Sequence, residues 1–68
     1  MSVYRVIDVI GTSPSSWEEA AAEAISTAAT SVRDLRVAEV TKQDVVIGDE
    51  GALLYRTKLQ LSFKTAQV

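Results

Sequence analysis

The 68-residue sequence contains no cysteine and no histidine, and it has one proline and a single tryptophan. Without cysteine it cannot form a disulfide or a thiolate metal site, and without histidine it lacks the usual zinc ligand and the commonest acid–base group. A chain this short buries only a small share of its surface, so we expect its own core to give marginal stability. Oligomerisation is then the remaining means of stabilisation.

The sequence also lacks long apolar runs and clustered basic residues. Seven Lys and Arg are scattered among nine Asp and Glu, for a net charge of −2. Phosphate contacts need clustered positive charge, so we expect no nucleic-acid partner, and the missing apolar run argues against a membrane partner. The opening MSVYRVIDV has neither the basic region nor the cleavage pattern of a signal peptide, which favours a cytoplasmic protein.

Groups that could support catalysis are isolated from one another. Ser13, Ser15 and Ser16 have no histidine to activate them, and the lysines show no evident desolvating pocket. Carboxylates are present, but we do not expect a chain of this size to build a cleft of its own around two of them. The sequence therefore predicts a non-enzymatic protein with no catalytic residues.

Four segments have the patterns of regular structure. Val3–Ile10 is rich in β-branched and aromatic residues and stops at Gly11, which predicts a strand that ends in a turn. A helix is expected from about Pro14 to Val32. Two further strands are expected over Leu35–Ile47 and Leu53–Lys64, joined by the turn GDEG. The last strand alternates most clearly between apolar and polar residues.

The predicted helix has two alternative starts and a narrow apolar stripe. Ser13 before Pro14 fits one start, and Ser16 with Glu19 fits a capping box. Alanine dominates the stripe, which would let a sheet approach closely, while tryptophan and isoleucine supply bulk. The stripe consists of Trp17, Ala20, Ala21, Ala24, Ile25, Ala28 and Val32.

These segments predict a single α+β domain over residues 1–68 with the order β-α-β-β. A strand–helix–strand crossover leaves the first two strands parallel, and the hairpin makes the third antiparallel to the second. Placing the third strand in the middle satisfies both conditions, which gives a three-stranded antiparallel sheet of order 1-3-2 with one helix on one face. The other face would expose apolar residues, which suggests partner subunits or a ligand.

The chain resembles the dodecin family along nearly its whole length. The resemblance rests on the opening YRVIDVIGTS, the alanine-rich helix, the segment around AEV and the closing YRTKLQLSFK. It implies a hollow homododecamer with the helices outside and the sheets lining the interior. In most members it also implies that paired flavin rings stack between tryptophans of two-fold related subunits, with a glutamine of the third strand bonded to the ring edge.

In this sequence the two flavin-binding positions of the family fall on Val37 and Arg56. Valine has no aromatic face, so the stacking contribution of about 1 kcal/mol for each ring pair is lost. Arginine loses the amide acceptor and adds a charge. We expect Arg56 either to hold an anionic ligand or to fill the pocket through an ion pair with a carboxylate. The usual flavin site is thus predicted to be degenerate, and riboflavin or FMN binding in a pocket without tryptophan is the alternative function.

The segments SPSSWEEAAAEA, RVAEV, QD and YRTKL are similar to members without this tryptophan, the calcium dodecins. That resemblance implies a calcium-binding or storage protein. Calcium takes six to eight oxygen ligands, and QDVVIGDEG lacks the spacing of an EF-hand loop. A calcium site would therefore collect ligands from several subunits, with Asp44 and Glu39 as candidates. The alternative for both residues is a solvated carboxylate or one paired with a neighbouring Arg or Lys.

Overall fold

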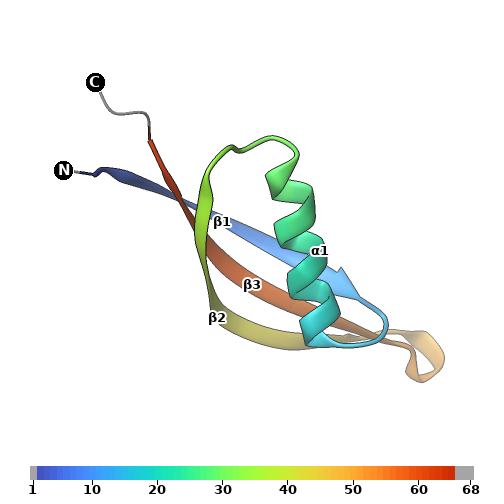
Figure 1. The fold of residues 1–68 in the computed structure, drawn as a ribbon. Helices are drawn as coiled ribbons and strands as arrows, with labels where there is room; N and C mark the ends of the chain where they lie inside the picture. Colours follow the sequence, from blue (N-terminus) through green and yellow to red (C-terminus); the bar gives the residue numbers. More distant parts are fainter. Residues whose placement is uncertain (1, 66–68) are drawn as a thin grey trace.

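Three strands and one α-helix follow each other in the order expected from the sequence (Figure 1). The computed structural model describes residues 2–65. Strand β1 spans Tyr4–Ser13, helix α1 spans Trp17–Ala29, and strand β2 spans Leu35–Ile47. A short 3-10 turn, η1, spans Asp49–Gly51 and leads into strand β3 at Leu53–Lys64.

The bounds of β2 and β3 are those predicted, whereas the helix is shorter than predicted. The helix starts after Ser16, whose side chain accepts a hydrogen bond from the Glu19 backbone at 3.0 Å, so the capping-box start is confirmed and the Pro14 start is wrong. Ser13 instead closes the preceding turn, because its Oγ accepts from the backbone N–H of Ser15 at 3.0 Å. Within residues 2–65, no helix is long and apolar enough to cross a membrane.

Strand β1 does not end at Gly11 but continues two residues further, to Ser13. Gly11 pairs with Thr57 of β3 inside the sheet, so it is not a turn residue. A Cβ placed on Gly11 would collide with the backbone carbonyl of Ala20 and lie 2.9 Å from the Ala24 side chain. The glycine is therefore needed where α1 crosses β1 at close range.

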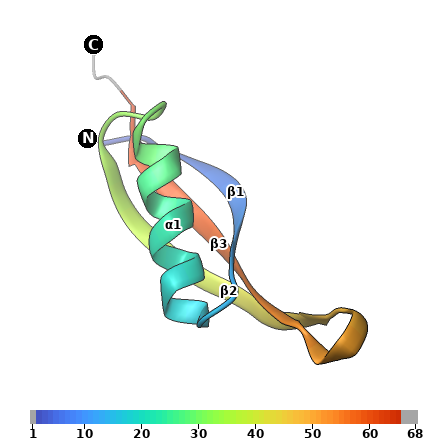
Figure 2. The same cartoon turned by 90° about the vertical axis from the view of Figure 1, so that its right-hand side faces the viewer.

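Strand β3 lies in the middle of the sheet, as predicted, and is antiparallel to both neighbours (Figures 1 and 2). The pairing of β1 with β3 is regular from Tyr4–Lys64 to Ser13–Tyr55. The pairing of β2 with β3 contains two register shifts, one at Arg36 and one at Thr41. Each shift leaves one β2 residue unpaired. The side chains after it therefore point to the opposite face from the one that strict alternation would give.

Helix α1 covers one face of the sheet and leaves the other uncovered (Figure 2). The covered face holds a small core in which Leu59 and Leu61 pack against Ala24. We call the uncovered side the open face. Alternation and register place on it Tyr4, Val6, Asp8, Ile10, Thr12, Val37, Glu39, Lys42, Asp44, Val46, Leu54, Arg56, Lys58, Gln60, Ser62 and Lys64. Val6, Ile10 and Val37 are each more than half exposed there, which confirms the expected uncovered apolar surface.

The molecule is longer than a compact domain of its size. It measures 54 × 20 × 14 Å, and its radius of gyration is 14.1 Å, compared with about 11 Å for a compact chain of this length. Its accessible surface is 5015 Å², whereas roughly 4,200 Å² is typical of a monomer of this mass. The β2–β3 hairpin continues beyond β1, which stops at the Ser13–Tyr55 pair. A two-stranded ribbon of this kind has little stability alone.

Candidate ligand-binding site

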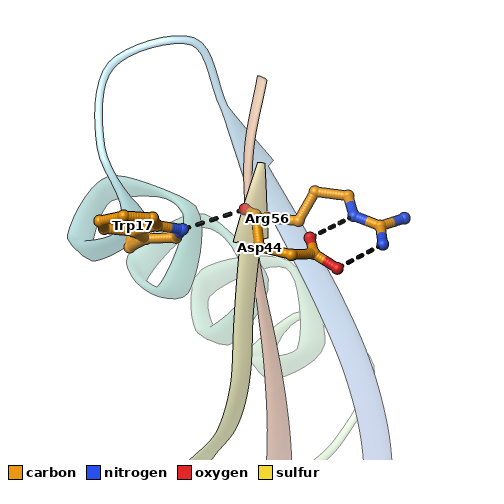
Figure 3. A network of polar contacts seen from close by, with 3 residues as sticks. All are labelled: Trp17, Asp44 and Arg56. Atoms are coloured by element: carbon orange, nitrogen blue, oxygen red, sulfur yellow. Dashed lines mark hydrogen bonds and ion pairs between the residues drawn. The ribbon is translucent and has the colours of Figure 1, made fainter. Parts of the chain in front are cut away.

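Asp44 and Arg56 form a two-pronged ion pair across β2 and β3 on the open face (Figure 3). Arg56 Nε donates to Asp44 Oδ1 at 2.7 Å, and Nη2 donates to Oδ2 at 2.7 Å. The Arg56 side chain is 40% exposed and the Asp44 side chain is 33% exposed, so water reaches both. The bonds from Arg56 hold the pKa of the Asp44 carboxyl below its usual range. We expected Arg56 either to hold an anionic ligand or to pair with a carboxylate, and the structure contains the ion pair.

Trp17 holds the same β2 residue from the opposite face of the sheet. Its Nε1 donates to the backbone carbonyl of Asp44 at 3.0 Å (Figure 3). Its ring meets the Tyr55 ring edge to face, with centroids 5.2 Å apart, and its own carbonyl accepts from Thr57 Oγ1 at 2.9 Å. Trp17 thus joins the first turn of α1 to both β2 and β3.

The two residues that the resemblance places at the family's flavin positions do not meet within one chain. Val37 lies opposite Ser62, and Arg56 lies opposite Asp44, so the two are six residues apart along β3. At a rise of about 3.4 Å per residue, that separation is roughly 20 Å. Val37 is 60% exposed at one end of the open face. A pocket that uses both positions therefore needs a second copy of the chain.

The two proposed calcium ligands also lie apart. Glu39 is opposite Gln60 and Asp44 is opposite Arg56, four residues along β3 and about 14 Å. Glu39 is exposed, and its side chain has no partner among residues 2–65. Within those residues, no three acidic side chains come close enough to hold a metal ion.

The bulge at Thr41 is the feature that the sequence pattern could not show. In a regular strand Glu39 and Asp44 would point to opposite faces, because they are an odd number of residues apart. The register shift between Val40 and Lys42 places both on the open face. Thr41 Oγ1 donates to the Lys58 carbonyl at 3.2 Å, which holds the bulge in place.

One protein family matches this chain over nearly its whole length. The family model described as dodecin matches residues 3–66. Calcium dodecin from Mycobacterium tuberculosis is 59% identical to this chain over 64 residues, which is 94% of this chain and 90% of that protein.

Solved structures share the fold as well. The crystal structure of the Mycobacterium tuberculosis protein, described as a calcium-chelating antigen with a calcium-binding site, matches with a TM-score of 0.88 and 57% identity over 96% of this chain and 93% of that one. A protein from Thermus thermophilus matches with a TM-score of 0.92 and 28% identity over the full length of both chains. The dodecin from Streptomyces coelicolor matches with a TM-score of 0.90 and 31% identity over 98% of this chain and 96% of that one.

Proposed function

Because this chain belongs to the dodecin family, we propose that it is a non-enzymatic, cytoplasmic ligand-binding or storage protein that forms a hollow shell of twelve copies and binds calcium. The observation that carries the proposal is the 59% identity to calcium dodecin over 64 residues. The Asp44–Arg56 ion pair supports the loss of the usual flavin site, because it engages Arg56 at the position where the family resemblance implies a glutamine that binds flavin.

The shape of the single chain supports assembly. Its core consists of few fully buried side chains, while the open face and the hairpin expose large apolar residues. Ile47 at the hairpin is 76% exposed, and Val37 at the far end of β2 is 60% exposed. Contacts between copies would bury such residues and supply stability that one chain lacks.

Calcium binding in this proposal requires more than one chain. Calcium takes six to eight oxygen ligands, and residues 2–65 of one copy bring no three acidic side chains together. Glu39 would contribute an exposed carboxylate, and its side chain has no partner within the part of its own chain that the structure describes. Both carboxylate oxygens of Asp44 already accept from Arg56, so Asp44 would share its remaining lone pairs or exchange partners on binding.

Native mass spectrometry of the purified protein tests assembly and ligand together. The protein is measured as purified, after chelation, and after calcium is returned. We expect a twelve-chain species that takes up calcium in a fixed ratio. A protein that stays monomeric or dimeric in every condition would overturn the shell, and a shell that takes up no calcium would overturn the ligand.

Calorimetric titration of calcium into matched variants tests the two ligand residues. Glu39→Gln and Asp44→Asn each remove one charge from the open face, and we expect each to weaken calcium binding by about tenfold or more. Glu18→Gln is the control. Glu18 is exposed on α1, so this substitution removes the same charge at a position away from the sheet. A residue whose variant binds as tightly as the control is not a ligand.

A further inference from the structure

Asp44 lies at the point where the β2–β3 hairpin leaves the three-stranded sheet. One position nearer the tip of the hairpin than the Asp44–Arg56 pair, Ser13 and Tyr55 form the last pair between β1 and β3. Beyond that pair the hairpin is a two-stranded ribbon, and such a ribbon has little stability of its own. The position of Asp44 therefore depends on contacts from outside the hairpin.

Trp17 supplies a contact of this kind from the first turn of α1. The helix packs chiefly on β1 and β3, yet Trp17 Nε1 donates to the backbone carbonyl of Asp44 on β2 at 3.0 Å. The tryptophan is itself fixed, because the fully buried Thr57 donates Oγ1 to its carbonyl at 2.9 Å and the Tyr55 ring packs against the indole. The indole N–H is therefore a donor that is held in a defined place.

Asp44 is thus bonded on both sides of the sheet (Figure 3). Trp17 binds its backbone carbonyl on the helix side, and Arg56 binds both oxygens of its carboxylate on the open face at 2.7 Å. Only two side-chain torsions separate the carboxylate from the backbone, and β2 is an edge strand that pairs with β3 in the described sheet. A shift of the carboxylate is therefore passed on to the carbonyl that Trp17 holds.

We propose that Trp17 is a positioning residue for the calcium site, and that its indole follows Asp44 when a ligand binds on the open face. The inference rests on the calcium binding proposed above and adds a residue that touches no ligand itself, because the indole lies on the other side of the sheet. Groups that orient the ligands of a metal commonly change metal affinity by 10- to 100-fold when they are removed. The fixed indole N–H sets the β2 backbone from which the Asp44 carboxylate projects.

Calorimetric titration of calcium into Trp17→Phe tests the positioning role. Phenylalanine keeps an aromatic ring beside Tyr55 but has no N–H, so we expect calcium binding to weaken by about tenfold. Ser16→Ala is the matched control, because it removes the neighbouring bond to the Glu19 backbone, with a similar loss of stability, and leaves the indole in place. Unchanged affinity in Trp17→Phe would overturn the role, and so would equal weakening in both variants.

Replacement of Trp17 by 3-benzothienylalanine separates the hydrogen bond from the packing of the ring. This amino acid has the shape of tryptophan with sulfur in place of the indole N–H, and it enters at one position because the sequence has a single tryptophan. We expect the same weakening of calcium binding as in Trp17→Phe. An affinity equal to that of the unchanged protein would assign the effect to packing and would overturn the role of the bond.

Tryptophan emission tests the coupling without calcium. Because Trp17 is the single tryptophan of the sequence, the emission reports on this residue alone. In the presence of a chelator, Arg56→Gln should shift the emission maximum, because it frees the Asp44 carboxylate. Lys64→Gln is the control, because it removes the same charge at the far end of β3, opposite Tyr4. Equal maxima in the two variants would overturn the coupling.

The two measurements together distinguish this inference from the function on which it rests. Calcium uptake by the unchanged protein should shift the Trp17 emission over the same range of calcium concentration as the calorimetric titration. Calcium binding that leaves the emission unchanged would overturn the role of Trp17 and leave the proposed function intact. Absence of calcium binding by the unchanged protein would overturn the proposed function and the positioning role with it, whereas the comparison without calcium would still decide whether Trp17 follows Asp44.

Discussion

At the residue scale, the backbone and the side chain of Asp44 serve different neighbours. Its carbonyl accepts from Trp17 on the helix side, and its carboxylate accepts from Arg56 on the open face. A substitution that changes only the carboxylate therefore tests the ion pair while leaving the contact with the helix in place. This separation makes the pH dependence of the pair measurable.

Asp44→Asn should lower the Tm at pH 7 and have little effect near pH 2. The pKa of Asp44 is lowered in the folded chain, so its stabilising effect is complete above the ordinary carboxyl pKa of about 3.9. The effect is lost as the pH falls through the lowered pKa. Thermal unfolding followed by circular dichroism from pH 2 to pH 7 measures this. A difference in Tm that is constant with pH would contradict the prediction, and Asp49→Asn in η1 is the control.

Val37→Trp combined with Arg56→Gln should restore riboflavin binding. The tryptophan supplies a stacking face worth about 1 kcal/mol beyond burial, and the glutamine restores an amide acceptor. Quenching of riboflavin fluorescence measures the binding. Val6→Trp with Arg56→Gln is the matched control, because Val6 and Val37 both pair with Ser62 from opposite sides. Equal quenching by both double variants would show that the added ring acts nonspecifically.

At the element scale, the contact between α1 and β1 depends on one missing Cβ. Ala20 is fully buried over Gly11, and its backbone carbonyl occupies the space that a side chain would need. The helix backbone cannot yield as a flexible side chain could. The distance between helix and sheet is therefore set at this point.

Gly11→Ala should destabilise the fold by about 3 kcal/mol, the upper part of the range for overpacked sites. Gly48→Ala is the control, because a Cβ there would lie 3.5 Å from the nearest atom, an ordinary contact. We expect the control to change the free energy of unfolding by no more than about 0.5 kcal/mol. Urea unfolding of both variants measures the difference. Similar losses of unfolding free energy in the two variants would show that α1 can move away from β1 with little loss of stability.

Element types and order were predictable from the sequence, whereas the site was only partly so. Alternation in Leu53–Lys64 indicates a strand with one buried face, and the structure buries Thr57, Leu59 and Leu61 on that face. The bulge at Thr41 leaves no sign in the residue types, so the shared face of Glu39 and Asp44 could not be predicted. The bond from Trp17 to Asp44 joins residues 27 positions apart, and only the tertiary structure brings them together.

At the scale of the whole molecule, polar substitutions at the exposed end of the β2–β3 hairpin should affect a single chain and an assembly differently. Ile47 and Leu53 face each other in the register and are 76% and 45% exposed. In an isolated chain, polar residues at these positions would change the free energy of unfolding only slightly. In a shell that buries them, the same changes would remove contacts between copies.

The double variant Ile47→Ser with Leu53→Ser should therefore shift the protein from the twelve-chain species to smaller ones. Native mass spectrometry at several protein concentrations measures the shift. Circular dichroism of the smaller species serves as the control and should retain the strand signal of the folded chain. A twelve-chain species of unchanged stability would place these residues outside the contacts between copies.

The central position of β3 has a consequence for how the protein is made. Both edge strands pair only with β3, and β3 is the last of the three to be synthesised. A nascent chain that has emerged only as far as Ile47 has two strands and a helix but no strand pair to join them. The Tyr4–Lys64 pair also closes a loop of nearly the entire described chain. Sheet formation is thus delayed until the third strand leaves the ribosome, and assembly between copies follows translation.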